Sequence, residues 1–398
     1  MTRAPLSQIL EGYRRTPRVV TWEVTRACPL RCTHCRAEAI RARHPDELDT
    51  REGRDLIDQV ADFGSPPPVL VFSGGDPLQR PDLLELVEYA GRKGLPTAVI
   101  PAPTADVDRG TVRALKEAGV RRLALSFDGA EAASHDAFRG EAGSFRAAVD
   151  AAKHADAEGL PLQVNTTVTR ETRRELPAIA DRVEEVGAVA WEVFLLVPLG
   201  RGALLEAPTP EETEEALAWL YRRGRKAPFR VVTVEGPMYR RIASQIEMAE
   251  GNESVIAGST SDGNGFVFVS HTGQVCPSGF LPVPGGDVRD GHLVDVYRNA
   301  SIFLELRDPS RLEGKCGACE YRKLCGGSRA RAWAVTGDWL ESDPFCPYVP
   351  DAYRERVEAG EAEPVEAYFA ARRQATVPGA DGFADADPRT AGPGLAPV

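Results

Sequence analysis

Apolar and polar residues follow two different patterns along this chain, and segments of the two patterns alternate. Short, wholly apolar runs, such as the one at 69–72, predict buried strands. Between these runs, spacings such as that of Leu56, Ile57, Val60 and Phe63 place apolar side chains on one face of a helix. The predicted strands lie at 19–24, 69–72, 97–100, 122–127, 162–168, 189–197 and 230–234. The predicted helices lie at 50–63, 82–93, 108–118, 144–157, 174–186 and 210–226.

This alternation predicts an α/β fold in which a parallel sheet is covered by helices. About six such units indicate a partial (β/α)6 barrel rather than a closed eight-fold one. The helix at 210–226 has a clear start, because Thr209 is a capping residue, Pro210 takes the first helical position and Glu212 the third. Chemistry in such folds gathers at the C-terminal ends of the strands, so the candidate residues should lie there.

Changes in composition divide the chain into parts. A stretch rich in Gly, Ser and Asn at 251–265 separates the barrel from a region that begins with a predicted hairpin and contains most of the later cysteines. The predicted parts are a polar leader over 1–17, the barrel over 18–250, a small cysteine-rich iron–sulfur domain over 251–350, a helical extension over 351–375 and a disordered tail over 376–398.

Charge and length exclude some function classes. The 398 residues carry a net charge of -11, which argues against a nucleic-acid groove built on bulk positive charge. Neither a signal peptide at 1–12 nor an apolar stretch of bilayer-spanning length is recognisable, so we expect a cytoplasmic protein without a membrane partner. In the reducing cytoplasm, eight clustered cysteines favour metal or cluster binding over disulfides.

Three cysteines, Cys28, Cys32 and Cys35, lie within eight residues directly after the predicted strand at 19–24. Thiolates with this spacing suit three corners of a cube-shaped 4Fe–4S cluster. The fourth iron would then be open to a ligand that carries an amine and a carboxylate. A structural zinc site is the alternative interpretation, with His44 as its fourth ligand.

A second set of cysteines has the spacing C-x2-C-x5-C at Cys316, Cys319 and Cys325, and Cys346 follows twenty-one residues later. Four sulfurs can complete a closed site. A zinc ribbon has the same layout, so this half of the sequence does not decide between zinc and an iron–sulfur cluster. Cys276 stands apart from both sets.

Two loops that follow predicted strands carry candidate ligand contacts. Gly74 and Gly75 allow the backbone to approach a ligand, and Asp76 follows them. Ser126 and Asp128 lie two positions apart, on one face of an extended segment, and can bind hydroxyls such as those of a ribose. A plain strand-to-helix turn and a surface Asp-Gly turn are the alternative interpretations.

Two further candidates come from later strands. Gln163, Asn165 and Thr167 place polar groups on one face of the strand at 162–168, where Asn165 can contact a cofactor or belong to a buried hydrogen-bond ladder. Arg201 lies between two glycines after the strand at 189–197 and can pair with a carboxylate. An exposed arginine in a turn is the alternative for Arg201.

The CxxxCxxC motif after a strand resembles the signature of the radical S-adenosylmethionine (SAM) enzymes. SGGD at 73–76 resembles the GGE-type motif of that family, with Asp76 in place of Glu, and SxDG at 126–129 resembles a further motif. The resemblance implies that a 4Fe–4S cluster on the three cysteines binds SAM and splits it to a 5'-deoxyadenosyl radical. It also implies contacts of SGGD with the SAM ammonium, of SxDG with the ribose, and of the strand end near Arg201 with the adenine and carboxylate. A low-potential electron donor such as flavodoxin or ferredoxin is expected, and no catalytic residue beyond the cluster is identified.

The later cysteines resemble the SPASM-type C-terminal extension of the same family. The resemblance implies one auxiliary 4Fe–4S cluster, which can carry an electron to or from the substrate radical or anchor the substrate. The full extension has another cysteine where this chain has Arg329, and Cys276 is left as a spare thiol rather than a ligand of a second auxiliary cluster. The predicted auxiliary ligands are Cys316, Cys319, Cys325 and Cys346.

The segment at 326–332, with TGD at 336–338 and DP at 343–344, is similar to subfamilies that act in heme and heme d1 formation and to mycofactocin-type peptide maturases. We therefore expect hydrogen abstraction from a tetrapyrrole side chain. One alternative is modification of a ribosomally made peptide. Another, from a different class, is a non-catalytic zinc or iron–sulfur scaffold or electron-transfer protein.

Overall fold

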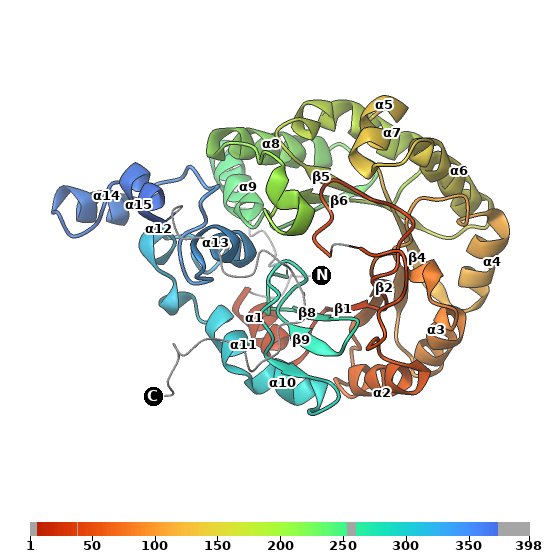
Figure 1. Cartoon of the computed structure of the whole chain (residues 1–398). Helices are drawn as coiled ribbons and strands as arrows, with labels where there is room; N and C mark the ends of the chain where they lie inside the picture. The colour runs from red at the N-terminus through yellow and green to blue at the C-terminus, as the bar shows by residue number, and fades with distance from the viewer. Residues whose placement is uncertain (1–5, 38, 253–259, 373–398) are drawn as a thin grey trace.

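The computed structural model describes residues 6–37, 39–252 and 260–372 (Figure 1). Its centre is one sheet of ten strands in the order β10-β9-β8-β1-β2-β3-β4-β5-β6-β7. Strand β8 and strands β1 to β7 pair in parallel, whereas β9 and β10 pair antiparallel. The strands are β1 Val19–Glu23, β2 Val69–Ser73, β3 Thr97–Val99, β4 Val120–Ser126, β5 Leu162–Val168, β6 Ala190–Leu195, β7 Arg230–Val234, β8 Phe266–Val269, β9 Gln274–Cys276 and β10 Gly286–Asp287.

Helices surround the parallel part of the sheet, which curves into the partial barrel seen in Figure 1. The outer helices are α2 Thr50–Ala61, α3 Leu83–Arg92, α4 Arg109–Glu117, α5 Ala132–Arg139, α6 Ser144–Ala157, α7 Leu176–Glu185, α8 Pro210–Gly224 and α9 Met238–Ala249. The helices near the two chain ends are α1 Leu6–Arg15, α10 Leu293–Asn299, α11 Ser301–Leu306, α12 Gly314–Ala318, α13 Arg329–Thr336, α14 Asp351–Glu358 and α15 Val365–Arg372. Short 3-10 helices lie at Pro77–Gln79, Thr172–Glu175, Gly200–Leu204 and Pro309–Arg311.

The core lies between the sheet and the outer helices. Trp22 and Phe72, on neighbouring strands, are fully buried, as are Leu56 on α2 and Trp191 on β6. Successive residues of a strand point to opposite faces of the sheet. Trp22 faces the outer helices, so its neighbour Glu23 faces the interior of the barrel. The predicted partial barrel is thereby confirmed.

The start of α8 is as predicted. Thr209 Oγ1 accepts a hydrogen bond from the Glu212 N–H at 3.1 Å, and Glu212 Oε2 accepts one from the Thr209 N–H at 2.9 Å. This reciprocal capping box satisfies two backbone donors that the first turn leaves unpaired.

Seven of the described α-helices were not predicted. Helix α1 lies in the segment that the sequence indicated as a polar leader, and it is held by α10, where Tyr297 donates to the Tyr13 carbonyl and Arg298 to the Arg15 carbonyl at 2.9 Å. Helices α5 and α9, and helices α10 to α13 of the cysteine-rich region, were also missed. Short helices such as these depend on tertiary contacts, which a sequence period does not reveal.

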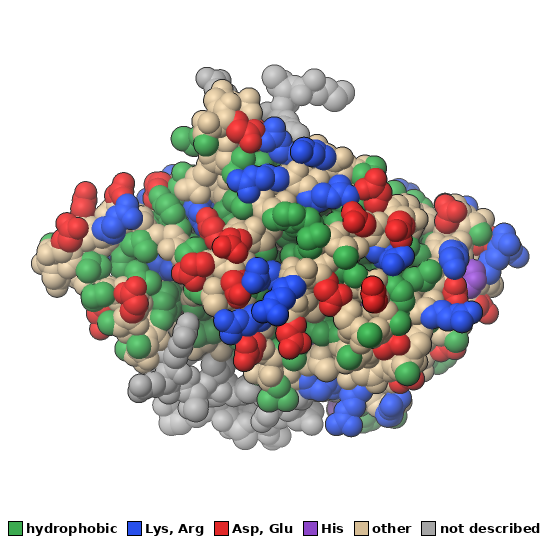
Figure 2. Space-filling view, turned by 90° about the horizontal axis from the view of Figure 1, so that it is seen from above, with side chains coloured by type: hydrophobic (Ala, Val, Ile, Leu, Met, Phe, Trp, Pro, Cys, Tyr) green, Lys and Arg blue, Asp and Glu red, His purple; other side chains and the backbone are tan. Residues whose placement is uncertain are grey.

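The predicted hairpin is present as β8 and β9, but β8 also pairs in parallel with β1. The sheet of the barrel therefore continues across the boundary predicted at residue 250. The tail predicted over 376–398 lies entirely outside the described residues, as do residues 373–375 of the predicted helical extension. Among the described helices, none combines the length and apolar character that crossing a bilayer requires. On the face shown in Figure 2, acidic and basic side chains are interspersed, and neither sign dominates.

Candidate active site and auxiliary cysteine site

The first three cysteines lie in the loop that follows the C-terminal end of β1. Cys28 and Cys32 are buried and pack with Leu30 and Ala102, and the partly buried Cys35 packs against them. Burial raises the pKa of the Cys28 thiol to about 12. A bound cation is the usual means of keeping such a thiol deprotonated. The loop thus gathers three sulfur donors of the type that an iron–sulfur cluster requires.

Arg139, on the unpredicted helix α5, joins this loop to Asp128. Its Nη1 donates to Cys32 Sγ at 3.5 Å, and its Nη2 lies 2.6 Å from Asp128 Oδ2. Burial opposes ionisation of Asp128, but the charge of Arg139 holds the pKa of that carboxyl below its usual range. A buried ion pair therefore stands beside one of the predicted cluster ligands. Arg139 was not predicted as a site residue, because helix α5, which brings it to the cysteine loop, was not predicted either.

Gly74 and Gly75 pack against the backbone that leads into the cysteine loop. A Cβ on Gly74 would lie 2.3 Å from the Thr25 carbonyl oxygen, and one on Gly75 would lie 2.5 Å from the carbonyl oxygens of Arg26 and Ala27. The Gly75 N–H also donates to the Thr25 carbonyl at 2.8 Å. Close packing of two backbone segments thus explains both glycines, and their contact with SAM stays a prediction.

Asp76 is fully buried and bonded to its own surroundings. Its Oδ1 accepts from the N–H groups of Leu78 and Ala102, both at 3.2 Å, and its Oδ2 from Gln79 Nε2 at 3.2 Å. Burial raises the pKa of this carboxyl. The Asp76 N–H donates to the carbonyl of Ala27, directly before Cys28, at 2.7 Å. Asp76 therefore lies close to the cysteine loop, as the motif order predicted.

Asp128 is not the exposed turn residue of the alternative interpretation. Its side chain is buried, and Oδ1 accepts from the Thr167 N–H at 2.7 Å. Ser126 lies opposite Asn165 in the β4–β5 register, which brings these two predicted residues together at adjacent strand ends. Asn165 Oδ1 accepts from Gln163 Nε2 at 2.9 Å, as in the predicted ladder. Contact of these three residues with SAM remains a prediction.

Arg201 holds the cysteine loop from the end of β6. Its Nε donates to the Cys32 carbonyl at 2.8 Å, and its backbone N–H donates to the Cys35 carbonyl at 3.1 Å. Its Nη2 is buried and has no hydrogen-bond partner among the described residues. Arg201 can therefore support the loop and still offer one N–H group to a carboxylate, as predicted.

Inside the barrel, Glu192 on β6 lies beside Asn165 in the sheet register and accepts from Gln163 Nε2 at 2.9 Å. Burial raises its pKa to about 7. The sequence analysis did not single out this residue. Glu192 lies between Trp191 and Val193, whose buried side chains point to the outer helices. Because strand residues alternate between the two faces, the sequence alone could have placed Glu192 on the inner face.

A second polar group that the sequence analysis missed lies at the ends of β1 and β8. Glu23 Oε2 is 2.8 Å from His271 Nδ1, and Glu23 Oε1 is 3.5 Å from Arg36 Nη2. The Arg36 guanidinium lies over the Phe268 ring, 4.7 Å from its centroid. Cys276, on β9, is fully buried, and this burial raises the pKa of its thiol.

The four later cysteines are brought together, as predicted. They surround one pocket beside α9 and α12, together with three cationic side chains. Burial raises the pKa of Cys325 to about 12 and that of Cys319 to about 11. Among the described residues, no group of His, Cys, Asp or Glu is arranged to hold a single metal ion. The pocket is lined by Cys316, Cys319, Cys325, Cys346, Arg241, Lys315, Arg322, Gly326, Gly327, Tyr348 and Pro350.

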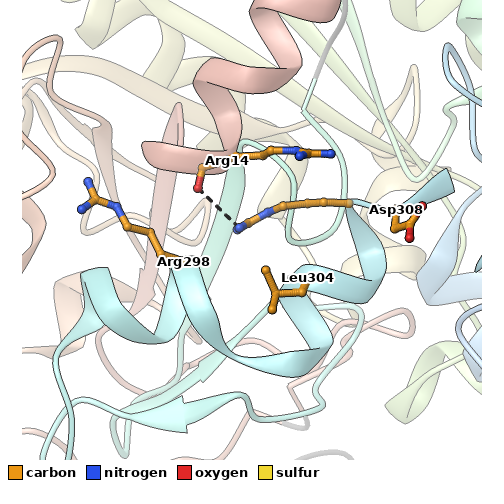
Figure 3. A pocket seen from close by; sticks show the side chains of 5 residues that line it. Arg14, Arg298, Leu304 and Asp308 are labelled. Atoms are coloured by element: carbon orange, nitrogen blue, oxygen red, sulfur yellow. Dashed lines mark hydrogen bonds between the residues drawn. The ribbon is translucent and has the colours of Figure 1, made fainter.

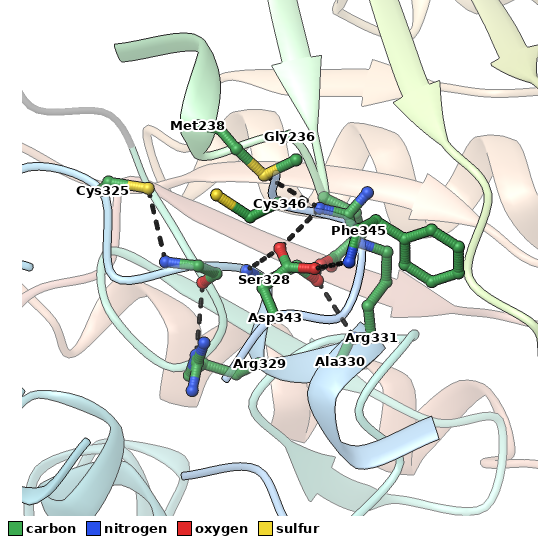
Figure 4. Close-up of polar contacts among 12 residues, drawn as sticks. Gly236, Met238, Cys325, Ser328, Arg329, Ala330, Arg331, Asp343, Phe345 and Cys346 are labelled. Atoms are coloured by element: carbon green, nitrogen blue, oxygen red, sulfur yellow. Dashed lines mark hydrogen bonds and ion pairs between the residues drawn. The ribbon is translucent and has the colours of Figure 1, made fainter. Parts of the chain in front are cut away.

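A buried polar network joins this pocket to the barrel (Figure 4). Asp343 Oδ2 accepts from the Ser328 N–H at 2.8 Å and lies 2.6 Å from Arg331 Nη2. Ser328 Oγ in turn donates to Glu235 Oε2 at 2.5 Å, directly after β7. Glu235 is the one non-glycine residue of the described chain with a positive φ, +54°. Residues in this strained region often mark functional sites.

A separate pocket between α1 and α11 is lined by Arg14, Arg298, Leu304, Arg307 and Asp308 (Figure 3). Arg307 donates to the Arg14 carbonyl at 3.5 Å. The pocket lies near the N-terminal ends of the strands, because Arg307 also bonds the Gly263 carbonyl just before β8. It is therefore at the opposite end of the barrel from the cysteine loop.

Comparison with known proteins places this arrangement in a family. A model of the radical SAM superfamily matches residues 22–183. The AdoMet-dependent heme synthase of Methanosarcina barkeri is 40% identical to this chain, over 84% of this chain and 97% of its own length. The chain belongs to the radical SAM superfamily. This radical SAM protein is also 32% identical to mycofactocin maturase MftC of Mycobacterium tuberculosis, over 86% of this chain and 87% of the maturase.

A solved structure, that of Streptococcus suis SuiB bound to S-adenosylmethionine, has a TM-score of 0.65 and 16% identity to this radical SAM protein. The match covers 84% of this chain and 78% of SuiB, and at this identity it shows the fold alone. The predicted family is confirmed, and membership implies a 4Fe–4S cluster and SAM. The sulfur donors of Cys28, Cys32 and Cys35 fit such a cluster.

Proposed function

We propose that this radical SAM enzyme is an oxidoreductase that acts on propionate side chains of an iron porphyrin. The observation that carries the proposal is the 40% identity to an AdoMet-dependent heme synthase, over 84% of this chain and 97% of the synthase. Because heme carries vinyl groups, we infer that the reaction removes a hydrogen atom and then CO2 from a propionate. The substrate is accordingly a small molecule.

In this proposal Cys28, Cys32 and Cys35 hold the cluster to which SAM binds. When bound, the cluster and SAM supply a 5'-deoxyadenosyl radical for hydrogen abstraction. The chain contributes a rigid loop, since Arg201 bonds the carbonyls of Cys32 and Cys35 and Gly75 packs against the preceding segment. A loop fixed in this way keeps the three sulfurs in one arrangement.

Further residues at the strand ends would orient SAM. Arg201 Nη2 has no hydrogen-bond partner among the described residues and can donate to the carboxylate of SAM. Ser126 and Asn165, on adjacent strands, can meet hydroxyl or amino groups. The segment Gly74, Gly75 and Asp76 is the proposed contact of the ammonium, with Asp128 near the ribose.

The second cysteine set has a role in this proposal as the site of an electron acceptor. When the substrate radical loses CO2 and forms a vinyl group, one electron has to leave it. We propose that an auxiliary 4Fe–4S cluster on the four later cysteines takes up this electron. The pocket that these cysteines line also contains three cationic side chains, and this arrangement supports the assignment. The electron that starts the reaction would come from a low-potential donor such as flavodoxin or ferredoxin, in the cytoplasm.

Anaerobically reconstituted protein with SAM, a reductant and iron coproporphyrin III provides the test. We expect 5'-deoxyadenosine together with a porphyrin that has lost CO2 and two hydrogens from a propionate, detected by mass spectrometry. If 5'-deoxyadenosine appears and the porphyrin stays unchanged, the substrate proposal is wrong. A peptide would then be favoured, as the 32% identity to a maturase suggests. Stoichiometric zinc without 5'-deoxyadenosine would instead support the non-catalytic scaffold.

A further inference from the structure

Buried cations stand close to the four later cysteines. Arg241, Lys315 and Arg329 are each at most 4% exposed, although such side chains are rarely buried without a partner. Arg241 and Lys315 line the cysteine pocket, and Arg329 begins the neighbouring helix α13. A burial of positive charge on this scale calls for negative charge at the same place.

Arg329 is fixed in position by backbone carbonyls and points one nitrogen at a sulfur. Its Nε donates to the Gly327 carbonyl at 3.2 Å, and its Nη1 donates to the carbonyls of Trp339 at 2.9 Å and Glu341 at 2.6 Å. Its Nη2 lies 3.8 Å from Cys316 Sγ. Among the described residues no carboxylate forms an ion pair with this guanidinium, so its charge faces the sulfurs.

Lys315 and Arg241 both contact Cys346. Lys315 donates to the Cys346 carbonyl and forms no ion pair with a carboxylate of the described chain. Arg241 Nη2 lies 3.8 Å from Cys346 Sγ, but Glu214 neutralises this guanidinium, with Oε1 2.8 Å from Nη1. Two of the three cations, Arg329 and Lys315, are therefore uncompensated.

We propose that Arg329, supported by Lys315, sets the reduction potential of the auxiliary cluster and makes that site an electron acceptor. The inference rests on the proposed function, because it assumes a cluster on the four cysteines. Reduction adds one negative charge to a buried site, and a fixed cation nearby stabilises the reduced form more than the oxidised form. The electron concerned is the one that leaves the substrate radical as CO2 departs and the vinyl group forms. The substrate is thereby oxidised and the cluster reduced by one electron.

The test is the midpoint potential of the auxiliary cluster, followed by electron paramagnetic resonance in a potentiometric experiment. Replacement of Cys28, Cys32 and Cys35 by Ala in one background leaves only the auxiliary signal. In that background Arg329→Gln should lower the potential by about 59 mV or more, which corresponds to a tenfold change in the equilibrium constant of a one-electron couple. Lys315→Met should lower it in the same direction, and it provides a second measurement if Arg329→Gln fails to fold.

Two matched variants separate charge from packing. Arg329→Lys keeps the charge but loses the fork of hydrogen bonds, so its potential should stay closer to the parent than that of Arg329→Gln. Lys323→Gln removes an exposed cation two residues from Cys325, where water screens it, and should leave the potential unchanged. If Arg329→Gln and Lys315→Met both bind iron and both keep the parent's potential, the inference is wrong, whereas the proposed auxiliary cluster stands. An iron-free parent would overturn the auxiliary cluster itself, and the inference with it.

Discussion

Single residues that were predicted to contact the cofactor also stabilise the first cysteine loop. Gly75 fits against the carbonyls of Arg26 and Ala27, and Arg201 bonds the Cys32 carbonyl. Asp128, predicted as a ribose contact, is paired with Arg139. The motif positions could be predicted from the sequence. The contacts of Arg139 and Arg201 with Cys32 could not, because each joins segments more than a hundred residues apart.

Gly75→Ala should remove iron from the first site. The added Cβ would lie 2.5 Å from two carbonyl oxygens, so the segment before Cys28 would have to move. We expect the reconstituted protein to hold about four rather than about eight iron per chain, measured by elemental analysis. Gly91→Ala is the control, because its Cβ meets no atom closer than 3.9 Å. Full iron content in Gly75→Ala would show that the loop tolerates the shift.

Asp128→Asn should destabilise the fold. It leaves the guanidinium of Arg139 buried without its counter-charge, a change that costs roughly 3–5 kcal/mol in the free energy of unfolding. Urea denaturation of the two proteins measures the difference. Glu206→Gln removes an exposed partner of Arg170 instead and should cost about 1 kcal/mol or less. Equal losses in the two variants would mean that the buried pair contributes no more than a surface one.

At the scale of elements, the strand at 162–168 and the helix at 144–157 agree with the structure at both ends. Buried parallel strands and amphipathic helices have clear periods, so most elements of the barrel could be predicted. The pairing of β8 with β1 could not, because a parallel partner is chosen by tertiary packing and not by local pattern. Helix α5, which carries Arg139, has only eight residues and no side-chain cap at its start.

Glu192, on β6 beside β5, should make the free energy of unfolding depend on pH. The pKa of Glu192 is raised to about 7, so the folded state binds its proton more tightly than the unfolded state. Its contribution to stability is therefore present below about pH 4.5 and is lost as the pH rises through about 7. We expect the free energy of unfolding to fall by roughly 1–2 kcal/mol between pH 5 and pH 8, a decrease that should be smaller in Glu192→Gln. The same slope in both proteins, measured by urea denaturation, would assign the effect to another group.

At the scale of the whole molecule, the C-terminal region closes against both edges of the parallel sheet. β8 pairs with β1 on one side, and Ser328 bonds Glu235 at the end of β7 on the other. The auxiliary cysteines are thus attached to the barrel through a strained and buried connection (Figure 4). The cysteine spacing predicted both sites. The substrate could not be derived from it, because hydrogen abstraction requires no conspicuous acid–base pair in the chain.

The central claim is that the cysteine loop after β1 supports reductive cleavage of SAM. The most direct test is the amount of 5'-deoxyadenosine that the reduced, reconstituted protein releases, compared with a variant in which Cys28, Cys32 and Cys35 are all Ala. The account predicts release by the parent and none by the variant, which should still hold about four iron per chain. Release of 5'-deoxyadenosine by the triple variant would contradict the account.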